Sequence, residues 1–302
     1  MKSKLIKKIN RLKKEKNAVI LAHNYQIEEV QAIADYTGDS LGLSQKAADI
    51  EEDIIVFCGV DFMAESAAIL APNKTVLLPE INAGCPMAEM ITAEKLREKK
   101  KEYPDAAVVC YVNSSAAVKA ESDICCTSSN AVEVVKAVSN KQILFVPDQN
   151  LGHYVSQQTD KEIILWDGYC ITHHRMLPEY ITEVREAHPK APIIVHPECR
   201  PEVVELADFV GSTGQITKYA QESNAETIIV GTEMGILYKL RLQNPDQNFY
   251  LLNQGLICQN MKLTSLENIA EALEKMQYRI EVDNQTRIKA QEALDKMLEI
   301  NG

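Results

Sequence analysis

A pattern of strand ends, repeated three times in the same order, limits the fold of this 302-residue chain more than any other feature. In each cycle a polar residue after a strand-like run is followed by a serine, a short polar segment and a cysteine. The cycles are His23, Ser40, 58–63 and Cys85; Asn113, Ser128, 147–150 and Cys170; and His196, Ser212, 231–235 and Cys258. The polar residue and the serine are 17, 15 and 16 residues apart, and the serine and the cysteine are 45, 42 and 46 residues apart. Successive cysteines are separated by 85 and 88 residues, so each cycle predicts one domain of about that length.

The runs between these residues predict the architecture. Short β-branched stretches, each followed by a helix-like stretch, indicate βα units around parallel strands. We therefore predict an α/β fold of three similar parallel-sheet αβα domains, arranged with pseudo-threefold symmetry around a central active site. The predicted segments are 1–102, with an N-terminal helix; 103–188; 189–262; and 263–302, with C-terminal helices that pack on the body. The N-terminal helix follows from the helical spacing of Leu5, Ile6, Ile9 and Leu12.

Composition argues against several classes of function. The net charge of −11 and the pI near 5.2 argue against a nucleic-acid surface, because phosphate binding requires clustered Lys and Arg. The longest unbroken apolar run, 106–112, is far shorter than the roughly 18 residues that a membrane-spanning helix needs. Eight cysteines without a secretory signal indicate reduced thiols, some of them metal ligands. We expect a cytoplasmic protein without nucleic-acid or membrane partners.

Cys85, Cys170 and Cys258 occupy the same place in the three cycles, just past the last predicted strand. Ligands of open α/β sheets bind beyond the carboxyl ends of the strands, so three inward-facing domains would bring these thiols together. Three unrelated buried cysteines are the alternative, but the matched placement favours ligation. Structural zinc sites use paired spacings and four protein ligands, whereas a [4Fe–4S] cluster on three thiolates leaves one iron open. We predict one such cluster, whose open iron acts as a Lewis acid.

Polar side chains at the other strand ends predict the rest of the cavity. Hydroxyls near helix starts bind phosphate or carboxylate together with backbone N–H groups, although such residues commonly only cap a helix. Residues two apart on a strand share one face and can carry proton donors and acceptors to one site. The hydroxyl candidates are Ser40, Ser128, Ser212 and Thr213, and the pairs are His23 with Tyr25, Tyr111 with Asn113, and His196 with Glu198. His153, His173, His174 and His188 have no counterparts in the repeat and are interpreted as structural residues.

Nine motifs, in order along nearly the whole chain, resemble the quinolinate synthase family. They are LAHNYQ, PEINAGCPMA, YVNSSAAVKA, CTSSNA, PDQNLG, WDGYC, HPEC, GSTGQITKY and GTEMG. The resemblance implies a triangular three-domain fold and the condensation of iminoaspartate with dihydroxyacetone phosphate to give quinolinate, phosphate and water in de novo NAD biosynthesis. It also implies that the open iron binds the substrate-derived intermediate. Functional coupling to L-aspartate oxidase or aspartate dehydrogenase, which supply iminoaspartate, would follow.

The matching motifs also suggest roles for individual residues. They imply that Cys85, Cys170 and Cys258 are the cluster ligands. The residues implied to line the active site are His23, Ser40, Tyr111, Asn113, Ser128, His196, Glu198, Ser212 and Thr213. For catalysis, Glu198 and His196 are candidates for general acid–base steps, and Tyr25 and Tyr111 for proton positioning. The hydroxyls would hold phosphate or carboxylates.

One departure concerns the third ligand, where some family members carry CxxCxxC. Here Met261 replaces the second of those cysteines, so a local thiol–disulfide switch is not expected. The other five cysteines match no ligand position and are interpreted as buried strand residues. They are Cys58, Cys110, Cys125, Cys126 and Cys199.

Two further functions stay open on the sequence alone. A cluster-free phosphosugar aldolase or lyase would use strand-end hydroxyls and a carboxylate without iron. A brown protein with stoichiometric iron and sulfide would favour the cluster, and a colourless active enzyme would favour the lyase. A non-enzymatic iron–sulfur sensor is less favoured, because the chain has neither a basic DNA-reading helix nor an evident partner segment.

Overall fold

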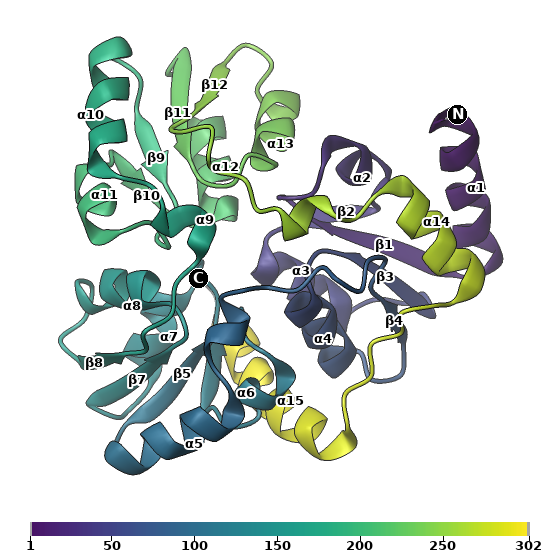
Figure 1. The fold of residues 1–302 in the computed structure, drawn as a ribbon, viewed down its shortest axis with the longest axis horizontal. Helices are drawn as coiled ribbons and strands as arrows, with labels where there is room; N and C mark the ends of the chain where they lie inside the picture. The colour runs from purple at the N-terminus through teal and green to yellow at the C-terminus, as the bar shows by residue number, and fades with distance from the viewer. Residues whose placement is uncertain (1, 301–302) are drawn as a thin grey trace.

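The computed structural model describes residues 2–300 and shows three lobes placed as a triangle around a common centre (Figure 1). Each lobe contains a four-stranded, wholly parallel sheet in which the first strand lies between the second and the third. The orders are β2-β1-β3-β4, β6-β5-β7-β8 and β10-β9-β11-β12. The prediction of an α/β fold with three similar parallel-sheet domains is therefore confirmed. The domain boundaries themselves stay a prediction.

The first sheet is buried on both faces. Its strands are β1 (Ala18–His23), β2 (Tyr36–Gly38), β3 (Ile54–Cys58) and β4 (Thr75–Leu77), and its helices are α1 (Lys2–Glu15), α2 (Glu28–Ile33), α3 (Ser40–Ala48) and α4 (Asp61–Leu70). Alternate residues of one strand face opposite sides, so Ile20 packs in the core beneath α1 whereas Leu21 packs in the core that includes α3 and α4. Burial on both sides explains why β1 is apolar up to Ala22, before His23 at its end.

The second lobe repeats this arrangement. Its strands are β5 (Ala107–Tyr111), β6 (Ile124–Cys126), β7 (Gln142–Val146) and β8 (Glu162–Leu165). The helices before and within it are η1 (Ala88–Met90), α5 (Ala93–Glu102), α6 (Ala116–Lys119), α7 (Ala131–Ala137) and α8 (Gln149–Ser156). Helix α5 packs against α6 of this lobe. The cores of the first and second lobes are continuous, since Val109 and Phe145 belong to the same buried cluster as Leu21.

The third lobe completes the triangle. Its strands are β9 (Ile193–Val195), β10 (Phe209–Val210), β11 (Thr227–Gly231) and β12 (Asn248–Leu251). Its helices are α9 (Ile171–His174), α10 (Pro178–Ala187), α11 (Pro201–Leu206), α12 (Thr213–Glu222) and α13 (Ile236–Gln243). Ile193 and Val195 pack against Ile181 of α10 and Val203 of α11, so this sheet too is covered on its outer face.

The last elements join the lobes. They are η2 (Asn260–Lys262), α14 (Leu266–Lys275) and α15 (Asn284–Glu299). Helix α14 packs on α1 and β3 of the first lobe, and α15 contacts β6 and α6 of the second lobe and α4 of the first. Between them, the chain at Arg279 forms an antiparallel bridge with Leu77, so the edge strand β4 is not left open.

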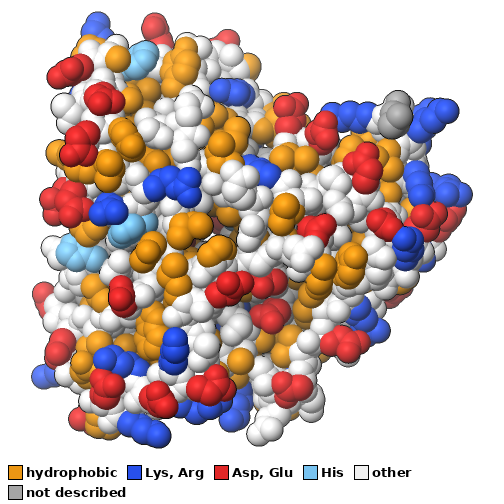
Figure 2. Space-filling view, viewed as in Figure 1, with side chains coloured by type: hydrophobic (Ala, Val, Ile, Leu, Met, Phe, Trp, Pro, Cys, Tyr) orange, Lys and Arg blue, Asp and Glu red, His pale blue; other side chains and the backbone are white. Residues whose placement is uncertain are grey.

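Two properties of the structure concern the nucleic-acid and membrane partners considered above. Figure 2 shows acidic and basic side chains interspersed over the visible face. Within residues 2–300, no helix combines the length and the apolar character needed to cross a lipid bilayer.

Candidate functional site

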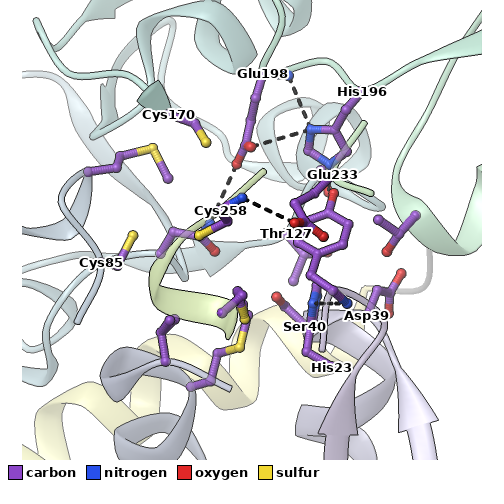
Figure 3. A pocket seen from close by; sticks show the side chains of 18 of the residues that line it. His23, Asp39, Ser40, Cys85, Thr127, Cys170, His196, Glu198, Glu233 and Cys258 are labelled. Carbon is purple, nitrogen blue, oxygen red and sulfur yellow. Dashed lines mark hydrogen bonds and ion pairs between the residues drawn. The ribbon is translucent and has the colours of Figure 1, made fainter. Parts of the chain in front are cut away.

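A central cavity lies where the three lobes meet, with an empty volume of about 660 Å³. Its walls come from the loops after the carboxyl ends of strands in all three sheets, the place where open α/β sheets bind ligands. Figure 3 shows two ends of this space. Cys85, Cys170 and Cys258 lie toward one end, and His23, Asp39 and Ser40 lie toward the other.

The cysteine end is built from one loop of each lobe. Cys85 follows β4, Cys170 precedes α9 and Cys258 follows β12. All three line the cavity and are half-buried, whereas the other five cysteines are buried. Burial raises the pKa of Cys85 to about 12 and also raises the pKa of Cys170 and Cys258. These thiols therefore keep their protons unless a cationic group is bound, and metal binding releases such protons.

The spacing of the three sulfur atoms tests which metal group the site fits. In the described part of the chain, the three do not form a group in which every pair of ligand atoms lies within 4.8 Å. Tetrahedral zinc with bonds of about 2.3 Å would hold its sulfurs roughly 3.8 Å apart. At least one pair of these sulfurs is thus too far apart for all three thiols to share one zinc ion, and this spacing leaves room for a larger, polynuclear group.

A hydrogen-bonded chain crosses the wall beside Cys170. His173 Nδ1 lies 2.7 Å from Glu198 Oε2, and Nε2 lies 2.9 Å from Thr232 Oγ1. Thr232 Oγ1 is 2.6 Å from the hydroxyl of Tyr25. A carboxylate only accepts, so Nδ1 carries the proton and, in the neutral ring, Nε2 accepts from Thr232, which accepts from Tyr25. This tautomer is assigned from the partners of the ring.

Glu198 is the centre of this network. Its Oε1 accepts a hydrogen bond from Tyr111 at 2.8 Å, and Asn113 Nδ2 lies 3.5 Å from the same oxygen. Burial alone would raise the pKa of Glu198, but nearby His196 and His173 and the hydrogen bonds from His173 and Tyr111 outweigh it and lower the pKa to about 2. The residue is therefore a carboxylate at neutral pH.

Two histidines and two tyrosines of the cavity are neutral. Burial lowers the pKa of His196 to about 3 and that of His23 to about 4, so both rings are uncharged imidazoles. Burial also raises the pKa of Tyr25 and Tyr111, so both phenols keep their protons. A buried carboxylate among neutral donors and acceptors is suited to general acid–base chemistry.

At the hydroxyl end, hydrogen bonds between side chains connect the three lobes. Ser212 caps α12 by accepting from the N–H of Gln215, within a capping box. Its Oγ lies 2.8 Å from Ser129 Oγ, and Ser129 donates to Asp39 Oδ2 at 3.1 Å. Asp39 in turn caps α3 through the N–H of Gly42 at 3.0 Å. Because Ser129 has one proton, Ser212 donates to Ser129, and a directed chain of hydroxyls ends on Asp39.

The predicted site residues are brought together with one exception. Twelve of the thirteen line the cavity, and Ser212 does not. The lining residues are His23, Tyr25, Ser40, Cys85, Tyr111, Asn113, Ser128, Cys170, His196, Glu198, Thr213 and Cys258. Ser212 lies behind them, since its hydroxyl is used by the cap and by Ser129. Asn113 Oδ1 is buried without a hydrogen-bond partner and is free to accept from a bound molecule.

His173, which the sequence analysis interpreted as a structural residue, lies in the wall of the cavity. Its ring lines the cavity, stacks on His196 at 4.8 Å between centroids and contacts Glu198 and Cys170. The available signal was its position three residues after Cys170, which places it on the first turn of α9. His153, His174 and His188 do not line the cavity.

Other lining residues were also missed. They are neighbours of predicted ones or belong to the motifs of the repeat: Asp39, Leu41, Val60, Phe62, Met63, Gly84, Met87, Thr127, Ser129, Thr172, Glu233 and Met261. Asp39 and Ser129 each stand next to a predicted serine, and that adjacency was the signal. Thr232 lies on the same network without lining the cavity.

Comparison with known proteins identifies close relatives over the full length. A family profile described as "Quinolinate synthetase A protein" matches residues 7–299. The quinolinate synthase of Alkaliphilus metalliredigens is 60% identical over 297 residues, which cover 98% of this chain and 98% of that protein. The quinolinate synthase of Caldicellulosiruptor saccharolyticus is 56% identical over 299 residues, with 99% of both covered. That of Methanosarcina barkeri is 54% identical over 298 residues, which cover 99% of this chain and 98% of the relative.

Proposed function

The chain belongs to the quinolinate synthetase A family of enzymes, and from this we propose that it condenses iminoaspartate with dihydroxyacetone phosphate to give quinolinate, phosphate and water. The product would enter the de novo route to NAD. The observation that carries the proposal is the central cavity, in which one cysteine from each lobe faces a buried carboxylate and a set of hydroxyls. We propose that Cys85, Cys170 and Cys258 hold one [4Fe–4S] cluster there.

The bound cluster would supply a Lewis acid, since three thiolates leave one iron free for a substrate oxygen. Around it, the Glu198 carboxylate is the proposed general base, because it is ionised and buried. Tyr111 donates to Glu198 and holds it in place. His196, 3.2 Å from Ser128 Oγ at Nε2, is the proposed partner for proton transfer to and from the sugar-derived fragment.

Substrate binding is proposed at the hydroxyl end. The hydroxyls of Ser40, Ser128 and Thr213 line it, and Thr213 begins α12. The first backbone N–H groups of a helix favour an anion, so this end is the proposed place for the phosphate or a carboxylate. The neutral ring of His23 and the unpartnered Oδ1 of Asn113 would orient the remaining polar groups. Ser212 would support this end through Ser129 without touching substrate.

The test is anaerobic incubation of iron-replete protein with dihydroxyacetone phosphate and iminoaspartate, generated in place from L-aspartate by L-aspartate oxidase or aspartate dehydrogenase. Quinolinate, measured directly by chromatography and mass spectrometry, is the expected product. Its absence with both substrates present would overturn the proposal. A colourless protein that cleaves or condenses phosphosugars without iron would instead establish the lyase.

A further inference from the structure

In each lobe, one carboxylate residue follows the third strand, and these three residues have no role in the reaction proposed above. They are Asp61 after β3, Asp148 after β7 and Glu233 after β11, and they precede the cysteine of their own cycle by 24, 22 and 25 residues. Each belongs to the short polar segment of its cycle in the threefold repeat. We propose that Asp148 and Glu233 are positioning residues that hold the cluster cysteines Cys170 and Cys258 by accepting their main-chain N–H groups, with Asp61 beside the loop of Cys85 as their counterpart. The inference deepens the proposed function, because it rests on the proposed cluster site.

The main chain docks the three cysteine loops in the same way. In each lobe, an N–H group just after the third strand donates to the carbonyl two residues before the cysteine. The bonds run from Asp61 to Ala83 at 2.9 Å, from Gln149 to Gly168 at 2.7 Å and from Met234 to Leu256 at 2.9 Å. Asp148 and Glu233 each directly precede this donor, whereas Asp61 is itself the donor and is offset by one residue.

Asp148 is fully buried and uses its two carboxylate oxygens for two different donors. Oδ1 accepts from the N–H of Leu151 at 2.8 Å and caps α8. Oδ2 accepts from the N–H of Cys170 at 3.0 Å. One side chain thus ties the start of α8 to the loop that presents the cysteine.

Glu233 is also fully buried and holds the third loop with help from a counter-ion. Oε1 accepts from the N–H of Cys258 at 3.1 Å, and Oε2 accepts from the N–H of Gly235 at 2.7 Å. Lys262 Nζ lies 2.9 and 3.0 Å from the two oxygens and also donates to the carbonyl of Tyr25. The charge of the carboxylate is balanced, and its bond to the cysteine amide is charge-assisted.

Asp61 is the looser counterpart in the first lobe. Its Oδ1 accepts from the N–H of Phe62 at 2.7 Å, and its Oδ2 faces the cysteine loop, where a Cβ on Gly84 would lie 3.6 Å away. Among the described residues, Asp61 forms no hydrogen bond with the N–H of Cys85. We therefore expect the smallest effect at this position.

The physical consequence is a set of cysteine loops already in place before iron arrives. Hydrogen-bond partners that orient metal ligands typically change metal affinity by about 10- to 100-fold when removed. Their loss should therefore appear in the retention of iron, independently of turnover.

The Asp148→Asn variant should keep the cap of α8 and lose the hydrogen bond from the N–H of Cys170, because an amide has a single acceptor oxygen. With that oxygen on the N–H of Leu151, as in asparagine caps, the amide NH₂ faces the N–H of Cys170 and that bond is lost. In anaerobically purified holoprotein, we expect iron to pass to a chelator about 10- to 100-fold faster than in the wild type. The electron paramagnetic resonance (EPR) spectrum of the reduced cluster should also change. Glu233→Gln should act in the same direction.

Asp283→Asn is the matched control. Asp283 caps α15 through the N–H of Thr286 at 3.0 Å and is exposed, so this variant should lose iron at the wild-type rate. Wild-type rates and unchanged EPR spectra in both Asp148→Asn and Glu233→Gln would overturn the proposal; if Asp148→Asn does not fold, Glu233→Gln decides it. A wild-type protein that holds its cluster but makes no quinolinate would overturn the proposed reaction alone.

Discussion

The two ends of the central cavity follow the threefold repeat of the sequence to different degrees. At the cysteine end, each lobe contributes one half-buried thiol from the loop after its last strand, docked by the same main-chain hydrogen bond. At the hydroxyl end, the three equivalent serines differ. Ser40 is the first residue of α3 behind the cap Asp39, Ser128 stands in the turn before α7, and Ser212 is itself the cap of α12.

The difference teaches that a repeated spacing fixes where a residue lies but not what it does. A cysteine past a strand end takes the same place in each lobe, because its loop is docked by the same main-chain hydrogen bond. A hydroxyl at a helix start can cap the helix or face the cavity, and a shift of one residue decides between the two. The predictions that follow test the two ends separately.

The largest effect is expected at the cysteine end. Cys85→Ser should abolish both cluster assembly and quinolinate formation, because serine is a poor substitute for thiolate at iron. Cys58→Ala is the control, since Cys58 is buried in the core of the first lobe. It should retain iron, sulfide and turnover. Stoichiometric iron in Cys85→Ser would refute the equivalence of the three thiols.

Glu198→Gln should leave the cysteine end intact and stop the chemistry. The amide keeps the shape of the side chain but is no base, so we expect turnover to fall by about 10²- to 10⁴-fold with the absorption spectrum of the cluster unchanged. Steady-state quinolinate formation and the spectrum are measured on the same sample. Glu202→Gln, at an exposed position of α11, should behave as the wild type. Normal turnover in Glu198→Gln would remove the role proposed for Glu198.

At the hydroxyl end, acid should destabilise the fold through His23. Its pKa is lowered by burial to about 4 in the folded state, against about 6.5 in the unfolded chain. Between these values the unfolded chain binds more protons, so stability is fully present above pH 6.5 and falls as the pH is lowered toward 4. His23 should make the free energy of unfolding about 2 kcal/mol smaller at pH 5 than at pH 7.

Denaturant unfolding at both pH values checks this expectation. His23→Gln should reduce the difference between pH 7 and pH 5 by about that amount, whatever its stability at pH 7. His188→Gln, at an exposed position, should leave the difference as in the wild type. An unchanged difference in His23→Gln would show that protonation of this ring does not contribute.

The smallest effects should separate two serines with equivalent positions in the repeat. Ser212→Ala removes a cap and should cost about 1 kcal/mol of stability, seen in the melting temperature, with little change in KM. Ser128→Ala should leave the melting temperature nearly unchanged and raise the KM for dihydroxyacetone phosphate by roughly 2- to 10-fold, the range of one hydrogen bond. The reverse pattern would exchange the roles of the two residues.

Much of this site could be predicted from strand-end positions. Residues such as His23, Asn113 and His196 follow apolar strands at matching intervals, and parallel strands deliver their carboxyl ends to one edge. His173 could not be predicted in this way, because it stands on the short helix after the cysteine, where the other two cycles have Ala88 and Met261. Thr232 was also missed, since only the meeting of β11 with the loop of Tyr25 gives its hydroxyl two partners.

The sequence by itself determined that three similar parallel sheets form and that each presents one cysteine at the same place, because apolar runs and loop spacing are local properties of the chain. Only the tertiary structure decided which groups meet across lobes. Tyr111 and Glu198 are 87 residues apart and share a hydrogen bond, while Ser129 connects Asp39 with Ser212. Such contacts depend on how the lobes pack against one another, and the ionisation of Glu198 and His196 depends on the burial that this packing creates.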